Sequence, residues 1–202
     1  MSDHYLALAA AAEFRRKIER SEFLGLAFPC ASDEQFFASR QQIEKKHFDA
    51  THHCWAFRLF ANGATRQRSS DAGEPSGTAG RPILSAIEGA SVFDAGVVVV
   101  RWYGGVKLGT GGLARAYRDT AAETLRTAQL ADRFLYDSYQ VDVPFDSVGV
   151  IYRLLDAPNI VLRSEVFGET NVFTIDVRRS RSGELERALA ERRLAFVRAT
   201  PR

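Results

Sequence analysis

The segment from Arg101 to Gly112 holds the densest group of residues that could bind an anion, and no acidic residue occurs between Ala95 and Arg118. A β-branched apolar run leads into glycines, which a helical pattern then follows. Glycine permits positive φ, and unpaired N–H groups at a helix start can hold a phosphate. The candidate binding residues here are Arg101, Lys107, Arg115, Arg118, Gly104, Gly105, Gly109, Gly111 and Gly112. The alternative is that these glycines only form a tight, close-packed turn.

A second glycine-rich stretch, from Asp71 to Leu84, also opens a helical pattern. Arginines flank it, and the two stretches could converge on one phosphate-lined groove. The candidate binding residues in this stretch are Arg66, Arg68, Arg81, Gly77, Thr78 and Gly80. Thr78 is also expected to cap the helix. Asp71 and Glu74 are either acid–base groups or residues that only cap and brace the loop.

Two narrower interpretations of the first stretch fail. Gly104 and Gly109 have the spacing of a P-loop, but Thr110 stands where the lysine belongs, which argues against an NTPase. Gly109 to Ala114 fits the dinucleotide fingerprint, but the acid that should end the next buried strand is missing. A dinucleotide-binding fold is therefore rejected.

The run His52-His53-Cys54 could indicate a metal site or a nucleophile. Adjacent strand residues point to opposite faces, and no second cluster of Cys and His completes a tetrahedral zinc site. A hydrolase using His52 or His53 with Asp71 or Glu74 stays open as an alternative, provided that the fold brings an acid close. A packed core cysteine beside a hydrogen-bonded histidine is the simpler interpretation. The sequence predicts no cofactor and no metal.

The elements that must position these residues fall into two groups, with a boundary at residue 132. Residues 1–132 form the first domain, in which Ser32 caps a helix and residues 96–102 form a central strand buried on both faces. Residues 133–202 show the order β-α-β-β-α-β, which is the ferredoxin-like pattern. The expected strands are 23–30, 53–60 and 96–102, the expected helices begin near 33, 79 and 113, and residues 61–80 are expected to be mostly loop.

The composition limits the classes of function. The chain has 202 residues and a net charge of only +2, so a nucleic-acid interface must come from local clustering. Two cysteines make no disulfide framework, and no segment approaches the ~20 apolar residues that cross a bilayer. We therefore expect a reduced, cytoplasmic protein without a membrane partner. Eight arginines near the C-terminus are either a solvated face or a second track for phosphates.

Both glycine-rich stretches, together with Thr51 to Ala56, resemble the signature of the IMPACT/YigZ family over roughly residues 18–128. Relatives usually carry a second aspartate at the position of Ala72. The resemblance implies an α+β fold. Its N-terminal domain would be similar to a domain shared by a small-subunit ribosomal protein and elongation factor G, and its C-terminal ferredoxin-like domain would resemble one in elongation factor G. Eukaryotic relatives regulate translation through a kinase that senses uncharged tRNA, a role that the resemblance does not carry to this chain.

The sequence thus predicts a non-catalytic RNA- or ribosome-associated protein in the regulation of translation. Translation factors are further candidate partners, and a monomer is favoured. The alternatives are the hydrolase described above and a protein–protein interaction module that uses the exposed face of the second sheet.

Overall fold

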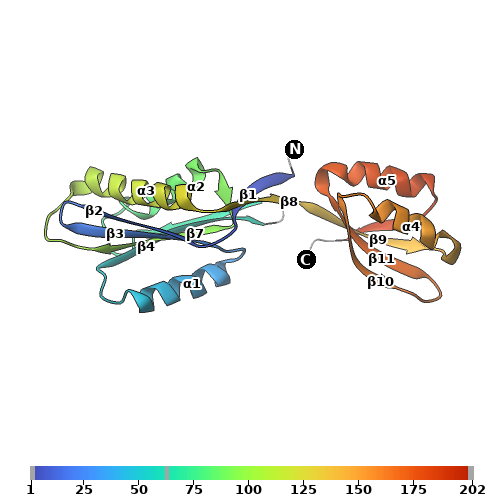
Figure 1. Ribbon diagram of the computed structural model, residues 1–202, viewed down its shortest axis with the longest axis horizontal. Coiled ribbons are helices and arrows are strands. Elements are labelled where there is room, and N and C mark those ends of the chain that lie inside the picture. Colours follow the sequence, from blue (N-terminus) through green and yellow to red (C-terminus); the bar gives the residue numbers. More distant parts are fainter. Residues whose placement is uncertain (1–2, 62–63, 200–202) are drawn as a thin grey trace. The chain divides into compact units, whose positions relative to one another are not determined.

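The computed structural model describes residues 3–61 and 64–199, which form a mixed α+β protein (Figure 1). The chain divides into two compact units. The first comprises Tyr5–Asp132, and the second comprises Arg133 onward together with Asp3 and His4.

The first unit is built on a five-stranded antiparallel sheet with the order β2-β3-β7-β4-β5. Its strands are β2 (Ala12–Ile18), β3 (Ser21–Pro29), β4 (His52–Ala61), β5 (Ala64–Ser70) and β7 (Ala95–Trp102). The β-branched run in β7 is fully buried and occupies the centre, as the sequence predicts. Because β7 is covered on both faces, its last residues enter the glycine-rich segment at a fixed position.

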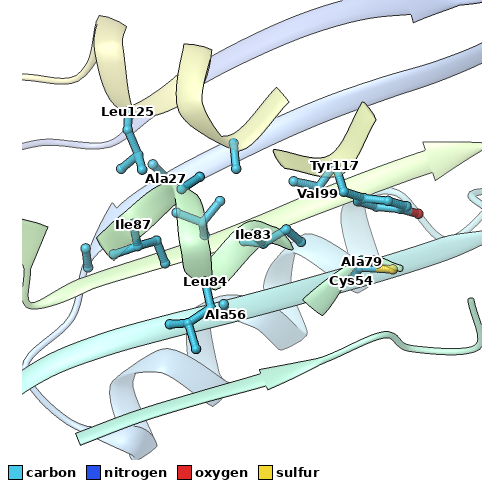
Figure 2. Packing of buried hydrophobic residues seen from close by; sticks show 14 of the residues in the cluster. Ala27, Cys54, Ala56, Ala79, Ile83, Leu84, Ile87, Val99, Tyr117 and Leu125 are labelled. Carbon is cyan, nitrogen blue, oxygen red and sulfur yellow. The ribbon is translucent and has the colours of Figure 1, made fainter. Parts of the chain in front are cut away.

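Helices cover both faces of this sheet (Figure 1). The helix α1 (Asp33–Lys46) packs its buried Phe36 against Trp55 and Phe57 on one face. The helices α2 (Gly80–Gly89) and α3 (Gly109–Thr127) pack on the other face. Figure 2 shows this second core, in which α2 and α3 supply Ile83, Ile87, Tyr117 and Leu125 over the strand residues Ala27, Cys54, Ala56 and Val99.

A second, three-stranded sheet has the order β6-β1-β8. It contains β1 (His4–Leu8), β6 (Val92–Phe93) and β8 (Leu130–Phe134), and β1 runs parallel to β6.

The second unit follows the predicted order β-α-β-β-α-β. Its elements are β9 (Tyr136–Val143), α4 (Val148–Leu155), β10 (Ile160–Val166), β11 (Asn171–Arg178), α5 (Ser182–Glu191) and β12 (Ala195–Ala199), with short 3₁₀ turns at Phe145–Ser147 and Arg179–Arg181. The strands form one antiparallel sheet with the order β10-β11-β9-β12. Its core contains Tyr139, Ile151, Phe173 and Leu189.

Three local predictions differ from the structure, and one is confirmed. Ser32 caps α1 by accepting a hydrogen bond from the Gln35 N–H. The expected loop at 61–80 contains the strand β5, whose side chains are mostly exposed and polar. The helix α3 begins at Gly109, four residues before the expected start, so its glycines form the first helical turn. Thr78 does not cap α2, because its hydroxyl donates to the Pro75 carbonyl at 2.6 Å.

The substitution Phe36→Ala tests the packing of α1 on the sheet. Phe36 is fully buried among aromatic rings, so its loss should lower the free energy of unfolding by about 3–5 kcal/mol. Urea denaturation followed by tryptophan fluorescence measures this unit alone, since both tryptophans, Trp55 and Trp102, lie in it. The matched control is Phe48→Ala at a position that is 84% exposed, where the change should stay within about 0.5 kcal/mol. Equal effects at both positions would contradict the packing described here.

Candidate functional site

The first turns of α2 and α3 border a pocket of about 440 Å³, which we call the arginine pocket. Its lining residues are Gly77, Arg81, Pro82, Ser85, Gly111, Ala114, Arg115 and Arg118. The side chains of Arg81, Arg115 and Arg118 are exposed. The fold therefore brings together three predicted cations that lie up to 37 positions apart in the sequence (118 − 81).

The charge of the arginine pocket is positive. Arg118 contacts the neighbouring Asp119, with 3.2 Å between Nε and Oδ1. Within the described ranges, neither Arg81 nor Arg115 makes an ion pair. No acidic residue lies in the first turn of α3, so the partial positive charge at its start is not offset there, whereas the start of α2 is held by the Asp71 carboxylate. This arrangement suits a phosphate.

A second pocket of about 480 Å³ lies where β7 ends and α3 begins, and we call it the Glu74 pocket. Its lining residues are Thr51, His52, Glu74, Pro75, Arg101, Tyr103, Lys107, Leu108, Gly109, Thr110 and Leu113. The loop that precedes α2 and the glycine-rich segment meet here, as the sequence predicts for one groove. They bring acidic and aromatic groups as well as cations.

Glu74 is the central acceptor of a buried hydrogen-bond network in this pocket. Its Oε1 accepts hydrogen bonds from Arg101 Nη1 at 2.6 Å and from the Tyr117 hydroxyl at 2.7 Å. Arg101 Nη2 also donates to Ser21 Oγ at 3.2 Å. The side chains of Arg101 and Glu74 are only 5% and 4% exposed. Arg101 is thus neutralised inside the protein and is no free cation for a polyanion.

The two histidines lie on opposite faces of the sheet. His52 shares the α2–α3 face with Cys54, and its Nδ1 lies 3.0 Å from the Ala72 carbonyl oxygen. His52 Nε2 lies 3.9 Å from Glu74 Oε1. His53 instead contacts the His47 carbonyl oxygen with Nε2 at 3.0 Å. The fold therefore brings His52, and not His53, to an acid.

Asp71 braces the loop before α2. Its carboxylate accepts hydrogen bonds from the backbone N–H groups of Gly77, Ala79 and Gly80 at 2.8–2.9 Å. Burial acts to raise the pKa of Asp71, but these three N–H groups hold it below its ordinary value. Asp71 therefore caps α2 in place of Thr78. Its carboxylate is engaged by three backbone N–H groups.

The cysteine of the His52-His53-Cys54 run is a buried thiol. Its Sγ donates to the Asp71 carbonyl oxygen at 2.9 Å. Burial raises the pKa of Cys54 to about 12, with smaller contributions from Glu74 and Asp71. Burial also raises the pKa of Tyr117, so its hydroxyl stays a donor to Glu74. Such a thiol is not an activated nucleophile.

The glycines of the first stretch have different surroundings. A Cβ at Gly104 would lie 1.8 Å from the Arg20 carbonyl oxygen, so this glycine is required by close packing. Gly105 and Gly109 have φ values of +87° and +70°, in the region that favours glycine. A Cβ at Gly111 would meet nothing within 4 Å, and one at Gly112 would come 3.2 Å from Leu108. The tight-turn interpretation therefore accounts for Gly104 without a ligand.

Two of the predicted cations lie away from both pockets. Arg66 and Arg68 on β5 pair with Asp33 at the start of α1, at 2.9 and 3.4 Å. The guanidinium of Arg68 also lies over the Phe37 ring of α1. Both arginines thus belong to the α1 face of the sheet. Lys107, by contrast, lies exposed at the Glu74 pocket and has no ion pair in the part of the chain that the structure describes.

Sequence reasoning missed Ser21, Tyr103 and Tyr117. Tyr117 lies on the helical face that packs against Phe23, so its spacing predicts only a core residue. Ser21 is separated from Arg101 by 80 positions, and no local pattern links them. Only Tyr103 could have been identified from the sequence, because an aromatic residue directly before Gly104 lies within the glycine-rich segment.

Several C-terminal arginines are paired with carboxylates of their own unit. The buried Asp137 pairs with Arg179 at 3.1 Å and with Arg198. Burial acts to raise the pKa of Asp137, while hydrogen bonds from Arg198, Ser182 and Arg179 lower it below its ordinary value. These arginines stabilise the sheet of the second unit.

No helix in the described ranges has both the length and the apolar character needed to cross a membrane. Among the same residues, no group of three or more His, Cys, Asp and Glu side chains is arranged to hold a metal ion.

Residues 19–125, which contain both pockets, match the family model of the Impact N-terminal domain. An IMPACT family member encoded in the pol 5′ region of Thermus thermophilus is 43% identical over 146 residues, which are 71% of this chain and 76% of that protein. The IMPACT family member YigZ of Escherichia coli K12 is 38% identical over 154 residues, 76% of each chain. A crystal structure described only as that of a hypothetical protein covers 100% of both chains, with a TM-score of 0.74 and 26% identity.

The buried thiols give a direct test of whether Cys54 can act as a nucleophile. Burial raises the pKa of Cys30 and Cys54 to about 12, so neither should react with a thiol reagent in the native protein at pH 8. Both should react at once in denaturant. An unfolded thiol ionises near pH 8.5, so from there to about pH 12 the unfolded chain binds fewer protons and the free energy of unfolding falls as pH rises. Rapid native labelling of Cys54 would contradict this assignment.

Proposed function

This chain belongs to the IMPACT family, and on that premise we propose that it is a non-catalytic RNA- or ribosome-associated protein that acts in the regulation of translation. The arginine pocket is the observation that carries this proposal. Such a protein works in the cytoplasm, where translation takes place, and its partners would be RNA, the ribosome or translation factors.

The proposal concerns a smaller surface than the sequence alone suggested. Arg81, Arg115 and Arg118 converge on the two helix starts, and Lys107 extends the positive charge toward the Glu74 pocket. Arg101 does not contribute, because Glu74 neutralises it. A polyanion with regularly spaced phosphates would contact the arginines and the start of α3 together, which gives affinity without sequence preference.

The proposal includes the domain organisation. Residues 1–132 would form an IMPACT-type domain similar to one in elongation factor G, and residues 133–202 a ferredoxin-like domain. The antiparallel order β10-β11-β9-β12, with two helices connecting the strands, supports the second assignment.

A second candidate function is hydrolysis, which the 3.9 Å separation of His52 Nε2 and Glu74 Oε1 favours. That distance is slightly longer than a direct hydrogen bond, so a small movement of the His52 ring would bring the two groups into contact. However, the Glu74 oxygen nearest His52, Oε1, already accepts hydrogen bonds from Arg101 and Tyr117. Hydrolysis is therefore the second candidate function, after RNA binding.

The salt dependence of RNA binding tests the main proposal. Log affinity of the native chain for a single-stranded RNA should fall linearly with log salt, and Arg115→Ala should reduce the slope by about one unit. The control is Arg66→Ala, which removes the same charge from the α1 face and should leave the slope unchanged. Fluorescence anisotropy over a salt series measures both. No binding at low salt, or equal effects of the two substitutions, would refute the proposal.

A panel of chromogenic ester and phosphoester substrates tests the hydrolase. We expect the native chain to give no turnover above that of His52→Ala. His53→Ala is the matched control, because His53 lies on the opposite face of the sheet. A rate that disappears with His52→Ala and persists with His53→Ala would establish the hydrolase instead.

A further inference from the structure

Among the described residues, the Glu74 pocket contains a buried hydrogen-bonding group without a partner, which the arginine pocket lacks. Its positive charge is partly cancelled by Glu74, and much of its wall is apolar or aromatic, with Pro75, Leu108, Leu113 and Tyr103. A volume of about 480 Å³ is within the usual range of small-molecule sites. This pocket is therefore suited to a ligand with a flat polar body, and a bare phosphate would leave most of it empty.

Two hydrogen-bond acceptors converge in the pocket. The Ala72 carbonyl can only accept, so the contact selects the His52 tautomer that carries its proton on Nδ1, in which Nε2 is an acceptor. Glu74 Oε1 takes both protein hydrogen bonds. Within the described ranges Glu74 Oε2 has no protein partner, and it is not among the fully buried unpaired atoms, so it is open to the pocket. Two neighbouring acceptors call for a ligand with two neighbouring donors.

Arg101, which also lines this pocket, has a buried donor without a partner among the described residues. Arg101 uses Nη1 and Nη2 for Glu74 and Ser21, and its Nε is fully buried and makes no hydrogen bond in the described part of the chain. A buried unpaired N–H is costly, so such a group indicates a missing acceptor. The ring that covers the Arg101 guanidinium on one side is Tyr103, at 5.2 Å, and Tyr103 is 44% exposed. Because Nε has no exposed surface, a ligand reaches it after the Tyr103 ring turns aside, and the ring can then stack on that ligand.

The pattern of acceptor, acceptor and donor matches one nucleobase. Guanine presents N2–H₂, N1–H and O6 along one edge, which is donor, donor and acceptor. Adenine and cytosine place an acceptor beside their amino group, and uracil has a single donor between two acceptors. Tyr103 offers a stacking surface for the base, while Lys107 and the N-terminal turn of α3 at Gly109 and Thr110 can hold its phosphate.

We propose that the Glu74 pocket binds a guanine nucleotide, with the base edge on His52, Glu74 and Arg101 and the phosphate near Lys107. The proposal rests on the proposed function only for the source of the nucleotide, which is either a guanosine within RNA or a free guanosine phosphate. Base contacts in this pocket would add specificity to the affinity that the arginine pocket supplies.

Calorimetry on the full chain with GMP, IMP and AMP tests the base contacts. IMP lacks only the 2-amino group, so it should bind at least about tenfold more weakly than GMP, because an acceptor in the pocket is left unpaired. AMP should bind more weakly still. Equal affinities of the three nucleotides, or no heat with GMP at millimolar concentration, would overturn the proposal.

Substitutions at exposed positions avoid disturbing the buried ion pair. Tyr103→Ala should weaken GMP binding by about fivefold or more through the lost stacking. Lys107→Ala should weaken GMP but leave unphosphorylated guanosine unchanged, which separates the phosphate contact from a general loss of folding. The control is Arg66→Ala, which lies on the α1 face away from both pockets and should leave GMP affinity unchanged. An unchanged GMP affinity in both Tyr103→Ala and Lys107→Ala would place the nucleotide elsewhere.

A third measurement separates the two sources and the two proposals. An oligoadenylate with one central guanosine is compared with the all-adenosine oligomer. A preference for the guanosine that Tyr103→Ala removes indicates an RNA residue as the ligand, whereas GMP binding without such a preference indicates a free nucleotide. Salt-dependent RNA binding, together with equal affinities for GMP, IMP and AMP, overturns the guanine proposal and leaves the RNA proposal standing. Specific GMP binding without any RNA binding overturns the RNA proposal and supports the guanine proposal.

Discussion

The buried ion pair of Arg101 and Glu74 is the interaction on which the arrangement of both pockets depends. It joins the end of the central strand β7 to the loop that precedes α2, while Tyr117 ties α3 to the same carboxylate and Ser21 ties β3 to the guanidinium. A pair that is about 95% buried is held in place by its partners, because removing either one would leave an uncompensated charge. Four segments distant in sequence are thereby joined through this one ion pair.

This constraint explains what the sequence could and could not predict. The central position of β7 followed from its uninterrupted β-branched run, and the cap of α1 followed from Ser32. The strand β5 was missed because it is an edge strand with exposed polar side chains and no alternation. For the site, the meeting of the two glycine-rich stretches was predictable from two helix starts. The pairing of Arg101 with Glu74 was not, since nothing local links positions 74 and 101.

The arginines show why charge in a sequence does not map directly onto charge at a surface. Arg101, Arg66 and Arg115 look equivalent as residues near glycine-rich segments. In the fold, the first is buried against Glu74, the second pairs with Asp33 on the other side of the sheet, and the third stays exposed without an ion pair in the described ranges. The three arginines differ in their burial and in their ion-pair partners. Both properties are set by contacts with residues distant in sequence.

The two pockets would contribute differently to binding, one through long-range attraction and the other through selectivity. Exposed arginines at helix starts attract any phosphate chain, and their contribution weakens as salt screens it. Buried groups of fixed position, such as Glu74 and the unpaired Nε of Arg101, contribute little long-range attraction but penalise a ligand that cannot satisfy them. The helix α3 lines both pockets, with Leu113 in the Glu74 pocket and Ala114 in the arginine pocket, so an RNA chain could contact both along this helix. Recognition and affinity would then be coupled through one rigid helix.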